Sequence, residues 1–255
     1  MSEAANGDRA LEGRTALVTG ASSGLGRATA VALAGAGADV ALVARSAQEL
    51  EETGEEVSRA GRRALVLPAD LAREDEAATV VERTVGEFGR IDVLINAAGI
   101  DVPGTVEELD VAGWDLTLSV NLRAPFLLSK AAFPRMREAG GGTIVNVSSV
   151  AGKKGWANAS AYCASKFGLT GLTEALADEG RGHGIRAIVL YPGAMATNWG
   201  AFSPEERQRS EPNGAPETQV LAPERVADFI AWFVASPPEF VLTEGIVLPI
   251  EEGLP

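Results

Sequence analysis

The chain has 255 residues, 46% of them hydrophobic, which is enough for one α/β domain with a buried core. Its formal net charge of −13 at pH 7 argues against nucleic acid or an anionic membrane as a partner, because both would repel it. A single cysteine, Cys163, rules out an internal disulfide, and with the single histidine, His183, it leaves too few soft ligands for a zinc site, so no metal is expected.

The first ten residues are expected to form a flexible tail, because they carry charges and lack the apolar run of a signal peptide. Residues 11–255 are expected to form one domain. The longest uncharged stretch, residues 187–204, contains proline and glycine, which interrupt a membrane-spanning helix. We therefore expect a soluble, cytoplasmic protein.

Short runs rich in Val, Ile and Leu alternate along the chain with longer helical stretches. The expected strands are Ala16–Thr19, Val40–Ala44, Ala64–Leu67, Val93–Asn96, Thr143–Val147, Ala187–Tyr191 and Gly245–Leu248. The expected helices are Gly24–Ala36, Ala47–Ala60, Arg73–Phe88, Val111–Ala139, Ser160–Gly180 and Pro223–Ala235. This alternation predicts a single doubly wound, Rossmann-like α/β domain, with a seven-stranded parallel sheet covered by helices on both faces.

A glycine-rich turn, Gly20–Gly26, joins the first strand to the first helix. Its three glycines let backbone amides approach a pyrophosphate at the positive end of a helix, so the turn predicts a dinucleotide site. The same stretch matches the G-x-S-x-G turn of serine hydrolases, with Ser22 as the nucleophile and His183 as the one available base.

The end of the second strand points to the form of the dinucleotide. An NAD-specific site places Asp or Glu there to accept from the ribose 2′-hydroxyl, whereas this strand ends in Ala44. Arg45 and Ser46 follow at the start of a helix, where a guanidinium, a hydroxyl and helix-terminal amides suit a 2′-phosphate. The sequence thus predicts NADP as the cofactor, with NAD as the second choice.

Other small or polar residues follow the remaining strands. In parallel sheets, ligands bind at the carboxyl ends of the strands, so these residues are expected on one rim with the glycine turn. They are Asp70 and Leu71 after the third strand, Asn96, Ala97, Ala98 and Gly99 after the fourth, Ser149 after the fifth, and Pro192, Gly193, Met195 and Thr197 after the sixth.

Tyr162 and Lys166 lie four residues apart in an expected helix, so they share one face with Cβ atoms about 5–6 Å apart. An ammonium group this close to a phenol favours the phenolate, and we expect it to lower the pKa of Tyr162 from the usual value of about 10. Tyr162 then becomes a proton donor and acceptor. Taken alone, the pair also fits an exposed tyrosine beside a solvated lysine.

Together these motifs resemble the short-chain dehydrogenase/reductase family. They are Thr19-Gly-x-x-x-Gly-x-Gly26, Asn96-Ala-Ala-Gly99, Asn121, Ser149, Tyr162-x-x-x-Lys166 and Pro192-Gly-x-x-x-Thr197. They occur in the order and at the distances typical of that family, and the likeness covers about residues 11–253. The resemblance implies an NAD(P)-dependent oxidoreductase, foremost an NADPH-dependent carbonyl reductase or alcohol dehydrogenase that transfers hydride to a ketone or aldehyde.

The resemblance also implies catalytic roles. Tyr162 would exchange a proton with the substrate oxygen, and Lys166 would lower the pKa of the phenol and hold the nicotinamide ribose. Ser149, rather than Ser148, would hydrogen-bond the substrate oxygen. Asn121 would join a water chain to Lys166.

For the cofactor, the resemblance places Asp70 near the adenine, Asn96 as a buttress of the sheet, and Thr197 at the carboxamide. Ser23 stands where many NADP-dependent relatives carry a basic residue, so the preference for NADP is expected to be moderate. The whole expected cofactor site is Gly20, Ser22, Ser23, Gly24, Leu25, Gly26, Arg45, Ser46, Asp70, Leu71, Asn96, Ala97, Ala98, Gly99, Tyr162, Lys166, Pro192, Gly193, Met195 and Thr197.

Substrate specificity is expected to reside in a lid at about residues 198–221 and in pocket positions near Asp101–Val102, Gly155–Trp156 and Trp199–Phe202. Their apolar character suits a hydrophobic substrate body. An acyl thioester, as in a 3-oxoacyl thioester reductase, a steroid-like ring, a sugar and a small ketone all stay open. So does a non-catalytic nucleotide-sensing module, although such a protein would be expected to lack one of the catalytic residues.

Two long expected helices, Val111–Ala139 and Ser160–Gly180, carry apolar residues on more than one face. The resemblance suggests that they pair across a two-fold axis and that Val247–Pro255 supports a second interface. We expect a homotetramer or, failing that, a homodimer, with a small-molecule substrate and neither nucleic acid nor membrane as a partner.

Overall fold

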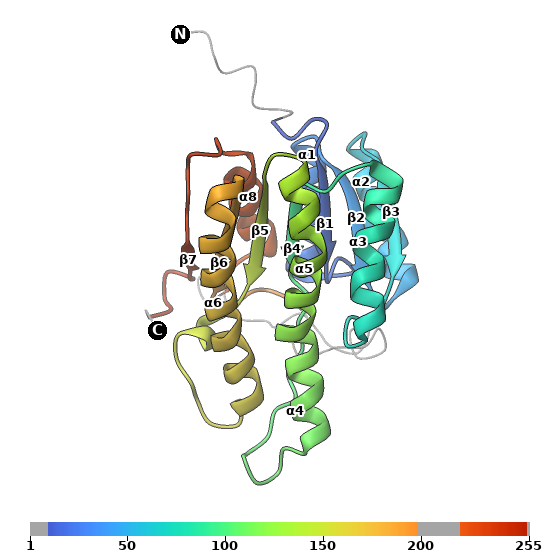
Figure 1. Ribbon diagram of the computed structural model, residues 1–255. Helices are drawn as coiled ribbons and strands as arrows, with labels where there is room; N and C mark the ends of the chain where they lie inside the picture. The colour runs from blue at the N-terminus through green and yellow to red at the C-terminus, as the bar shows by residue number, and fades with distance from the viewer. Residues whose placement is uncertain (1–9, 198–219, 254–255) are drawn as a thin grey trace.

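The computed structural model describes residues 10–197 and 220–253 and shows a single α/β domain (Figure 1). The strands are β1 (Thr15–Thr19), β2 (Asp39–Ala44), β3 (Ala64–Pro68), β4 (Val93–Asn96), β5 (Gly142–Val147), β6 (Ile185–Pro192) and β7 (Glu244–Val247). The helices are α1 (Gly24–Gly35), α2 (Ala47–Arg59), α3 (Glu74–Phe88), α4 (Val111–Leu118), α5 (Ala124–Glu138), α6 (Ser160–Gly180) and α8 (Pro223–Ala235).

The seven strands pair in parallel in the order β3-β2-β1-β4-β5-β6-β7. The predicted fold is therefore confirmed. Every residue of β4 and β5 is buried, because central parallel strands are covered on both faces. The strand order reverses between β1 and β4, and the crevice beyond the carboxyl ends of these two strands is where such sheets bind ligands.

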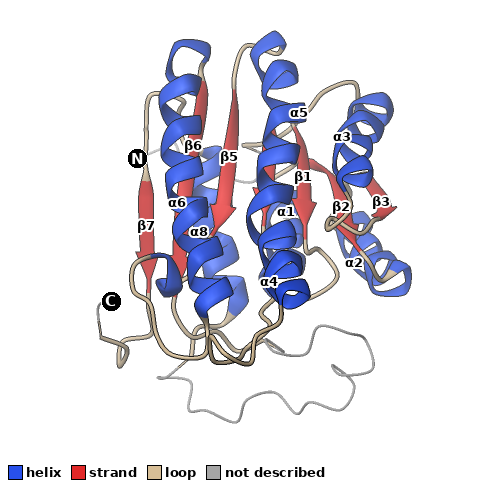
Figure 2. Cartoon of the chain, turned by 60° about the horizontal axis from the view of Figure 1, so that its bottom comes forward, coloured by secondary structure: helices blue, strands red, loops and turns tan. Residues whose placement is uncertain are grey.

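Two layers of helices cover the sheet (Figure 2). Buried side chains of α1, α2 and α8 pack with β1 and β2 into one apolar cluster, which includes Leu33, Leu50 and Phe233. On the opposite face, α3, α5 and α6 form a second cluster that includes Val80, Leu128 and Leu176. This rigid centre fixes the positions of the turns along the carboxyl rim.

The prediction of one continuous helix over residues 111–139 is wrong in one respect. Between α4 and α5 the chain makes a π-helical turn at Ser119–Arg123, in which the N–H of Ala124 bonds the carbonyl of Ser119, five residues back. Pro125 follows and has no N–H with which to continue the regular α-helical ladder. The wide turn contains Asn121, and π-helical turns of this kind are frequent at functional sites.

Most of the expected tail and lid lies outside the described residues. From Leu11 onward the chain belongs to the core, since this side chain is buried and its N–H bonds the carbonyl of Ala36. The end of the expected lid is described, and there Leu221 pairs with Met195. No helix in the described part of the chain has both the length and the apolar character needed to cross a bilayer.

Candidate active site

A cavity of about 980 Å³ opens at the carboxyl rim of the sheet. Its walls come from the turns after β1 to β6, which therefore meet as the sequence predicts. Of the expected site residues, these line it: Gly20, Ser22, Ser23, Gly24, Leu25, Gly26, Arg45, Ser46, Asp70, Leu71, Ala97, Ala98, Gly99, Ser149, Tyr162, Lys166, Pro192, Gly193, Met195 and Thr197.

The glycine turn at one end of the cavity has no room for side chains. Gly20 has a φ of +67°, which favours glycine, and a Cβ at Gly26 would lie 2.2 Å from the carbonyl oxygen of Gly20. The hydroxyl of Thr19 accepts from the N–H groups of Ala97 and Ala98 at 3.0 and 3.1 Å and so ties this turn to the turn after β4. The result is a shallow backbone cradle at the start of α1, which fits a pyrophosphate.

At the other end of the cavity, α6 presents Tyr162 and Lys166, which are only 8% and 3% exposed. This burial excludes the alternative of a solvated surface pair. The ammonium of Lys166 donates to the carbonyl of Val147 at 2.9 Å and lies 5.6 Å from the centroid of the Tyr162 ring. Ser149 hydrogen-bonds the phenol and also accepts from the N–H of Ala151 at 3.2 Å.

The pKa of Tyr162 differs from the sequence-based expectation. Burial raises it far above its usual value, the charge of Asp101 adds to the rise, and the hydrogen bond with Ser149 opposes it. Burial also lowers the pKa of Lys166 to about 8. The expectation that the pKa of the phenol is lowered is therefore wrong, because desolvation of the buried phenol raises it.

Asn121 lies behind the cavity wall rather than on it. Its side-chain oxygen accepts from the N–H of Ile100 at 2.9 Å, while its amide nitrogen donates to the carbonyl of Ile100 at 2.8 Å and to the hydroxyl of Ser165 at 3.1 Å. This clamp fixes the segment after β4 against α6. The predicted water chain to Lys166 stays a prediction.

Asn96 is also buried behind the wall. It donates to the side-chain oxygen of Asn146 at 2.7 Å, and Asn146 donates to the hydroxyl of Thr173 at 2.8 Å. The chain of three polar groups links β4, β5 and α6 beneath the site, in keeping with the expected buttress.

Both serines after β5 line the cavity, but their hydroxyls have different partners. The hydroxyl of Ser148 donates to the carbonyl of Lys166 at 3.3 Å, whereas Ser149 hydrogen-bonds the phenol of Tyr162, so the role at the substrate oxygen stays a prediction for Ser149. Beyond β2, Arg45 is exposed at the rim, and Ser46 begins α2 by accepting from the N–H of Glu49. The place expected for a 2′-phosphate thus contains a guanidinium and a helix N-terminus.

Several lining residues escaped the sequence analysis. Leu116 and Val120, four residues apart, form an apolar wall, and that helical spacing was the available signal. Glu252 reaches the turn after β6 and accepts from the N–H of Ala194 at 2.9 Å, yet no sequence motif marks it.

The serine hydrolase alternative lacks a base. His183, the one histidine of the chain, lies just before β6 and packs edge-on against Phe133, with ring centroids 6.2 Å apart. It is thus at the amino edge of the sheet, while Ser22 lies at the carboxyl edge. Within residues 10–197 and 220–253, no group of three His, Cys, Asp or Glu side chains could hold a metal ion.

Comparisons with known proteins agree with this architecture. A short chain dehydrogenase profile matches residues 14–208. The cis-4-hydroxycyclohexanecarboxylate dehydrogenase of Sinomonas cyclohexanicum is 37% identical over 241 residues, which cover 94% of this chain and 96% of the relative. D-threitol dehydrogenase of Mycolicibacterium smegmatis is 40% identical over 195 residues, which cover 76% and 74%. A metagenomic short-chain oxidoreductase, solved in complex with NADP, has a TM-score of 0.82 and 34% identity, with coverage of 95% of this chain and 100% of that one.

Proposed function

The chain belongs to the short-chain dehydrogenase/reductase family, whose members are oxidoreductases of alcohol and keto groups, and we propose that it is an NADP(H)-dependent carbonyl reductase or alcohol dehydrogenase. One observation carries the proposal: a buried tyrosine, its neighbouring lysine and a serine share one cavity with a backbone cradle shaped for a pyrophosphate. The dinucleotide supplies or accepts the hydride.

The chain itself supplies the proton and positions the reacting oxygen. In reduction, the hydroxyl of Tyr162 donates a proton to the carbonyl oxygen of the substrate, and Ser149 hydrogen-bonds that oxygen. Lys166, whose ammonium group donates to the carbonyl of Val147, would hold the nicotinamide ribose. Leu116 and Val120 supply apolar surface for the body of the substrate.

The preference for NADP rests on the end of β2. The strand ends in Ala44, so no carboxylate there repels a 2′-phosphate, and Arg45 and the N-terminus of α2 supply positive charge. The solved relative in complex with NADP supports the same choice. Ser23 in the glycine turn adds no charge, which makes the preference moderate.

Turnover with both dinucleotides tests the proposal. Purified protein is assayed for NADPH and NADH oxidation with a panel of aldehydes and ketones, and for the reverse reaction with alcohols. Tyr162→Phe should bind the dinucleotide normally but lose about two to four orders of magnitude in turnover. A wild type without turnover but with dinucleotide binding would instead favour the nucleotide-sensing module, and a Tyr162→Phe variant that retains a tenth of the activity would contradict the assigned proton donor.

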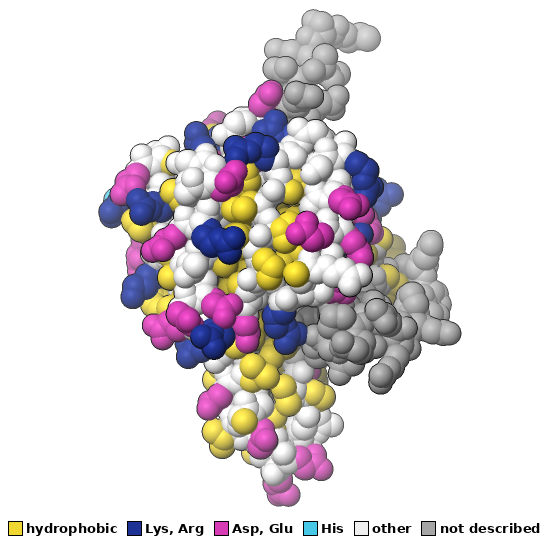
Figure 3. Space-filling view, turned by 90° about the vertical axis from the view of Figure 1, so that its right-hand side faces the viewer, with side chains coloured by type: hydrophobic (Ala, Val, Ile, Leu, Met, Phe, Trp, Pro, Cys, Tyr) yellow, Lys and Arg dark blue, Asp and Glu magenta, His cyan; other side chains and the backbone are white. Residues whose placement is uncertain are grey.

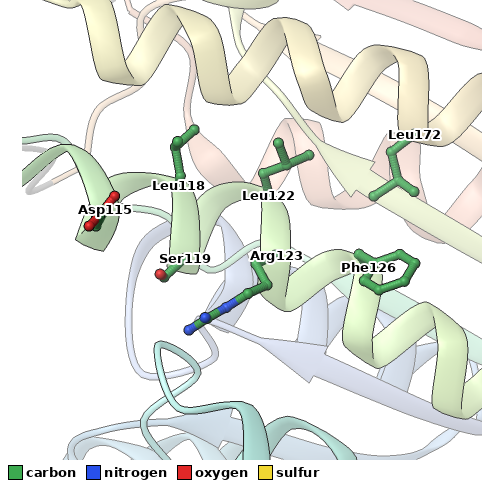
Figure 4. A pocket seen from close by; sticks show the side chains of 7 residues that line it. All are labelled: Asp115, Leu118, Ser119, Leu122, Arg123, Phe126 and Leu172. Carbon is green, nitrogen blue, oxygen red and sulfur yellow. The ribbon is translucent and has the colours of Figure 1, made fainter.

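We also propose a soluble, cytoplasmic homotetramer or homodimer, built through α5 and α6. Figure 4 shows Leu118, Leu122 and Phe126 along the continuous helical segment from α4 to α5, with Leu172 of α6 across from them. These residues line a hollow of about 640 Å³. Phe126 is 45% exposed and Phe167, on α6, is 47% exposed. Such large apolar side chains gain about 25 cal/mol for each Å² of surface that a second copy removes from water.

A further inference from the structure

Asp101 is a half-buried acid that the proposed chemistry does not use. It lines the same cavity as Tyr162, and its Oδ1 atom is inaccessible and has no hydrogen-bond partner among the described residues. Leaving a buried carboxylate oxygen without a donor is costly, and native structures rarely do so unless a ligand or a water completes the bond. The carboxylate of Asp101, one oxygen of which lacks a donor, therefore lies in the wall of the cavity that contains the phenol.

The backbone on both sides of Asp101 is fixed. On one side, Asn121 clamps the N–H and carbonyl of Ile100. On the other, the N–H of Gly104 donates at 3.0 Å to the carbonyl of Asn158, which lies in the left-handed region with a φ of +65°. These two anchors hold the backbone of Asp101 in place, so that its carboxylate is preorganised at the cavity wall.

The surroundings of Asp101 are acidic. Glu252 is a second carboxylate on the cavity wall, and Lys166, the one cation on this side of the described lining, already donates to Val147. The sequence from residue 101 to residue 122 contains five acidic residues and no lysine or arginine. Figure 3 shows hydrophobic and acidic side chains gathered on the projecting lower part of the molecule, where α4 lies in Figure 1. An anionic substrate group near Asp101 would thus meet repulsion without a compensating cation.

Electrostatic effects agree with this geometry. Burial raises the pKa of Asp101, so a donor that pairs with the carboxylate recovers part of its desolvation cost. The charge of Asp101 in turn raises the pKa of Tyr162, which places the two groups within electrostatic reach of each other.

We propose that Asp101 determines specificity by accepting a hydrogen bond from a second hydroxyl of the substrate, close to the reacting carbon, and by repelling substrates that carry a carboxylate there. The substrate class is a vicinal diol, or the hydroxyketone derived from it, on a ring or chain whose apolar side packs against Leu116, Val120 and Trp156. This inference rests on the proposed oxidoreductase function and refines its substrate class.

Three alcohols on one ring test it: cis-1,2-cyclohexanediol, cyclohexanol and cis-2-hydroxycyclohexanecarboxylate, each oxidised with NADP⁺. A hydrogen bond to a charged acceptor corresponds to about 10- to 100-fold, so kcat/KM should favour the diol over cyclohexanol by about that factor and leave the carboxylate poorest. Asp101→Leu should abolish the preference for the diol over cyclohexanol. Asp101→Asn, which removes the charge but little volume, should raise the turnover of the carboxylate.

The control is Glu107→Gln, an exposed acid on the same segment that does not line the cavity, and it should leave all three ratios unchanged. Thermal melting and NADP⁺ binding verify that each variant is folded. Equal turnover of diol and cyclohexanol, an unchanged preference in Asp101→Leu, or turnover of other alcohols but none of these three overturns the inference and leaves the proposed function standing. Absence of turnover with every alcohol and ketone, with either dinucleotide, overturns the proposed function itself.

Discussion

Gly26→Ala tests whether the glycine turn is a cradle that tolerates no side chain. A Cβ at this position would lie 2.2 Å from the oxygen and 2.6 Å from the carbon of Gly20, both of which belong to the backbone. The turn and α1 must separate by about 0.8 Å for the closer contact to reach 3.0 Å. Overpacking of this kind costs about 1–3 kcal/mol, and alanine regains about 0.5–1 kcal/mol of helix propensity.

The net loss at Gly26 is then about 1 kcal/mol, which lowers the melting temperature by about 2–4 °C in a protein of this size. Gly35→Ala is the matched control, because it changes the same residue type in the same helix, and a Cβ there meets nothing within 4 Å. It should leave the melting temperature unchanged or raise it by up to about 4 °C.

Dinucleotide affinity gives the second measurement. If the backbone amides of the turn hold the pyrophosphate, the displacement in Gly26→Ala should weaken NADP⁺ binding at least about tenfold. At a ligand concentration of about 100 times the wild-type Kd, NADP⁺ stabilises the wild type by about 2.7 kcal/mol and a tenfold weaker variant by about 1.4 kcal/mol. A Gly26→Ala protein that melts and binds NADP⁺ like Gly35→Ala would refute the steric argument.

Three further changes test the cofactor and assembly proposals. The wild type should lose affinity for the dinucleotide as the pH rises through about 8, because Lys166 then loses its proton. Lys166→Met should bind the dinucleotide more weakly and lack this pH dependence, as binding titrations at several pH values would show. Ala44→Asp with Arg45→Ala should reduce the ratio of kcat/KM for NADPH over NADH by about 10- to 100-fold, and an unchanged ratio would contradict the reading of β2. Phe126→Glu should reduce the molar mass by light scattering towards that of a smaller assembly, because it buries a charge in the proposed interface, and a monomeric wild type at micromolar concentration would contradict it.

The sheet could be predicted from the sequence because its information is local. Runs such as Val93–Asn96 are uniformly apolar and short, and the intervening helices carry their own periodicity, so strands and helices agree with the structure to within one or two residues. The break between α4 and α5 was harder to predict, because Ser119–Arg123 has an ordinary helical composition. Pro125 did not mark the break either, since proline is also common in the first turn of a helix.

Site residues could be predicted where they directly follow a strand or share a helix face. Gly20 follows β1, Tyr162 shares a face of α6 with Lys166, and all three line one cavity. Glu252 could not be, because its contact with Ala194 joins positions 58 residues apart. Asp101 was expected near the substrate, but the sequence does not show that its Oδ1 atom lacks a hydrogen-bond donor, because this depends on how the neighbouring segments pack.

The protonation of Tyr162 shows most clearly what spacing leaves undetermined. The distance to Lys166 follows from the helix, but the pKa follows from desolvation, which the sequence does not display. A phenol whose pKa is raised stays protonated through neutral pH, so it can donate to a carbonyl oxygen, while alcohol oxidation first requires the phenolate. We therefore expect ketone reduction to be nearly independent of pH between about 6 and 8 and alcohol oxidation to rise with pH over the same range, as kcat/KM profiles in both directions would show. Oxidation that is flat with pH would mean that the phenol ionises below neutrality, and that burial does not set the protonation state from which Tyr162 works.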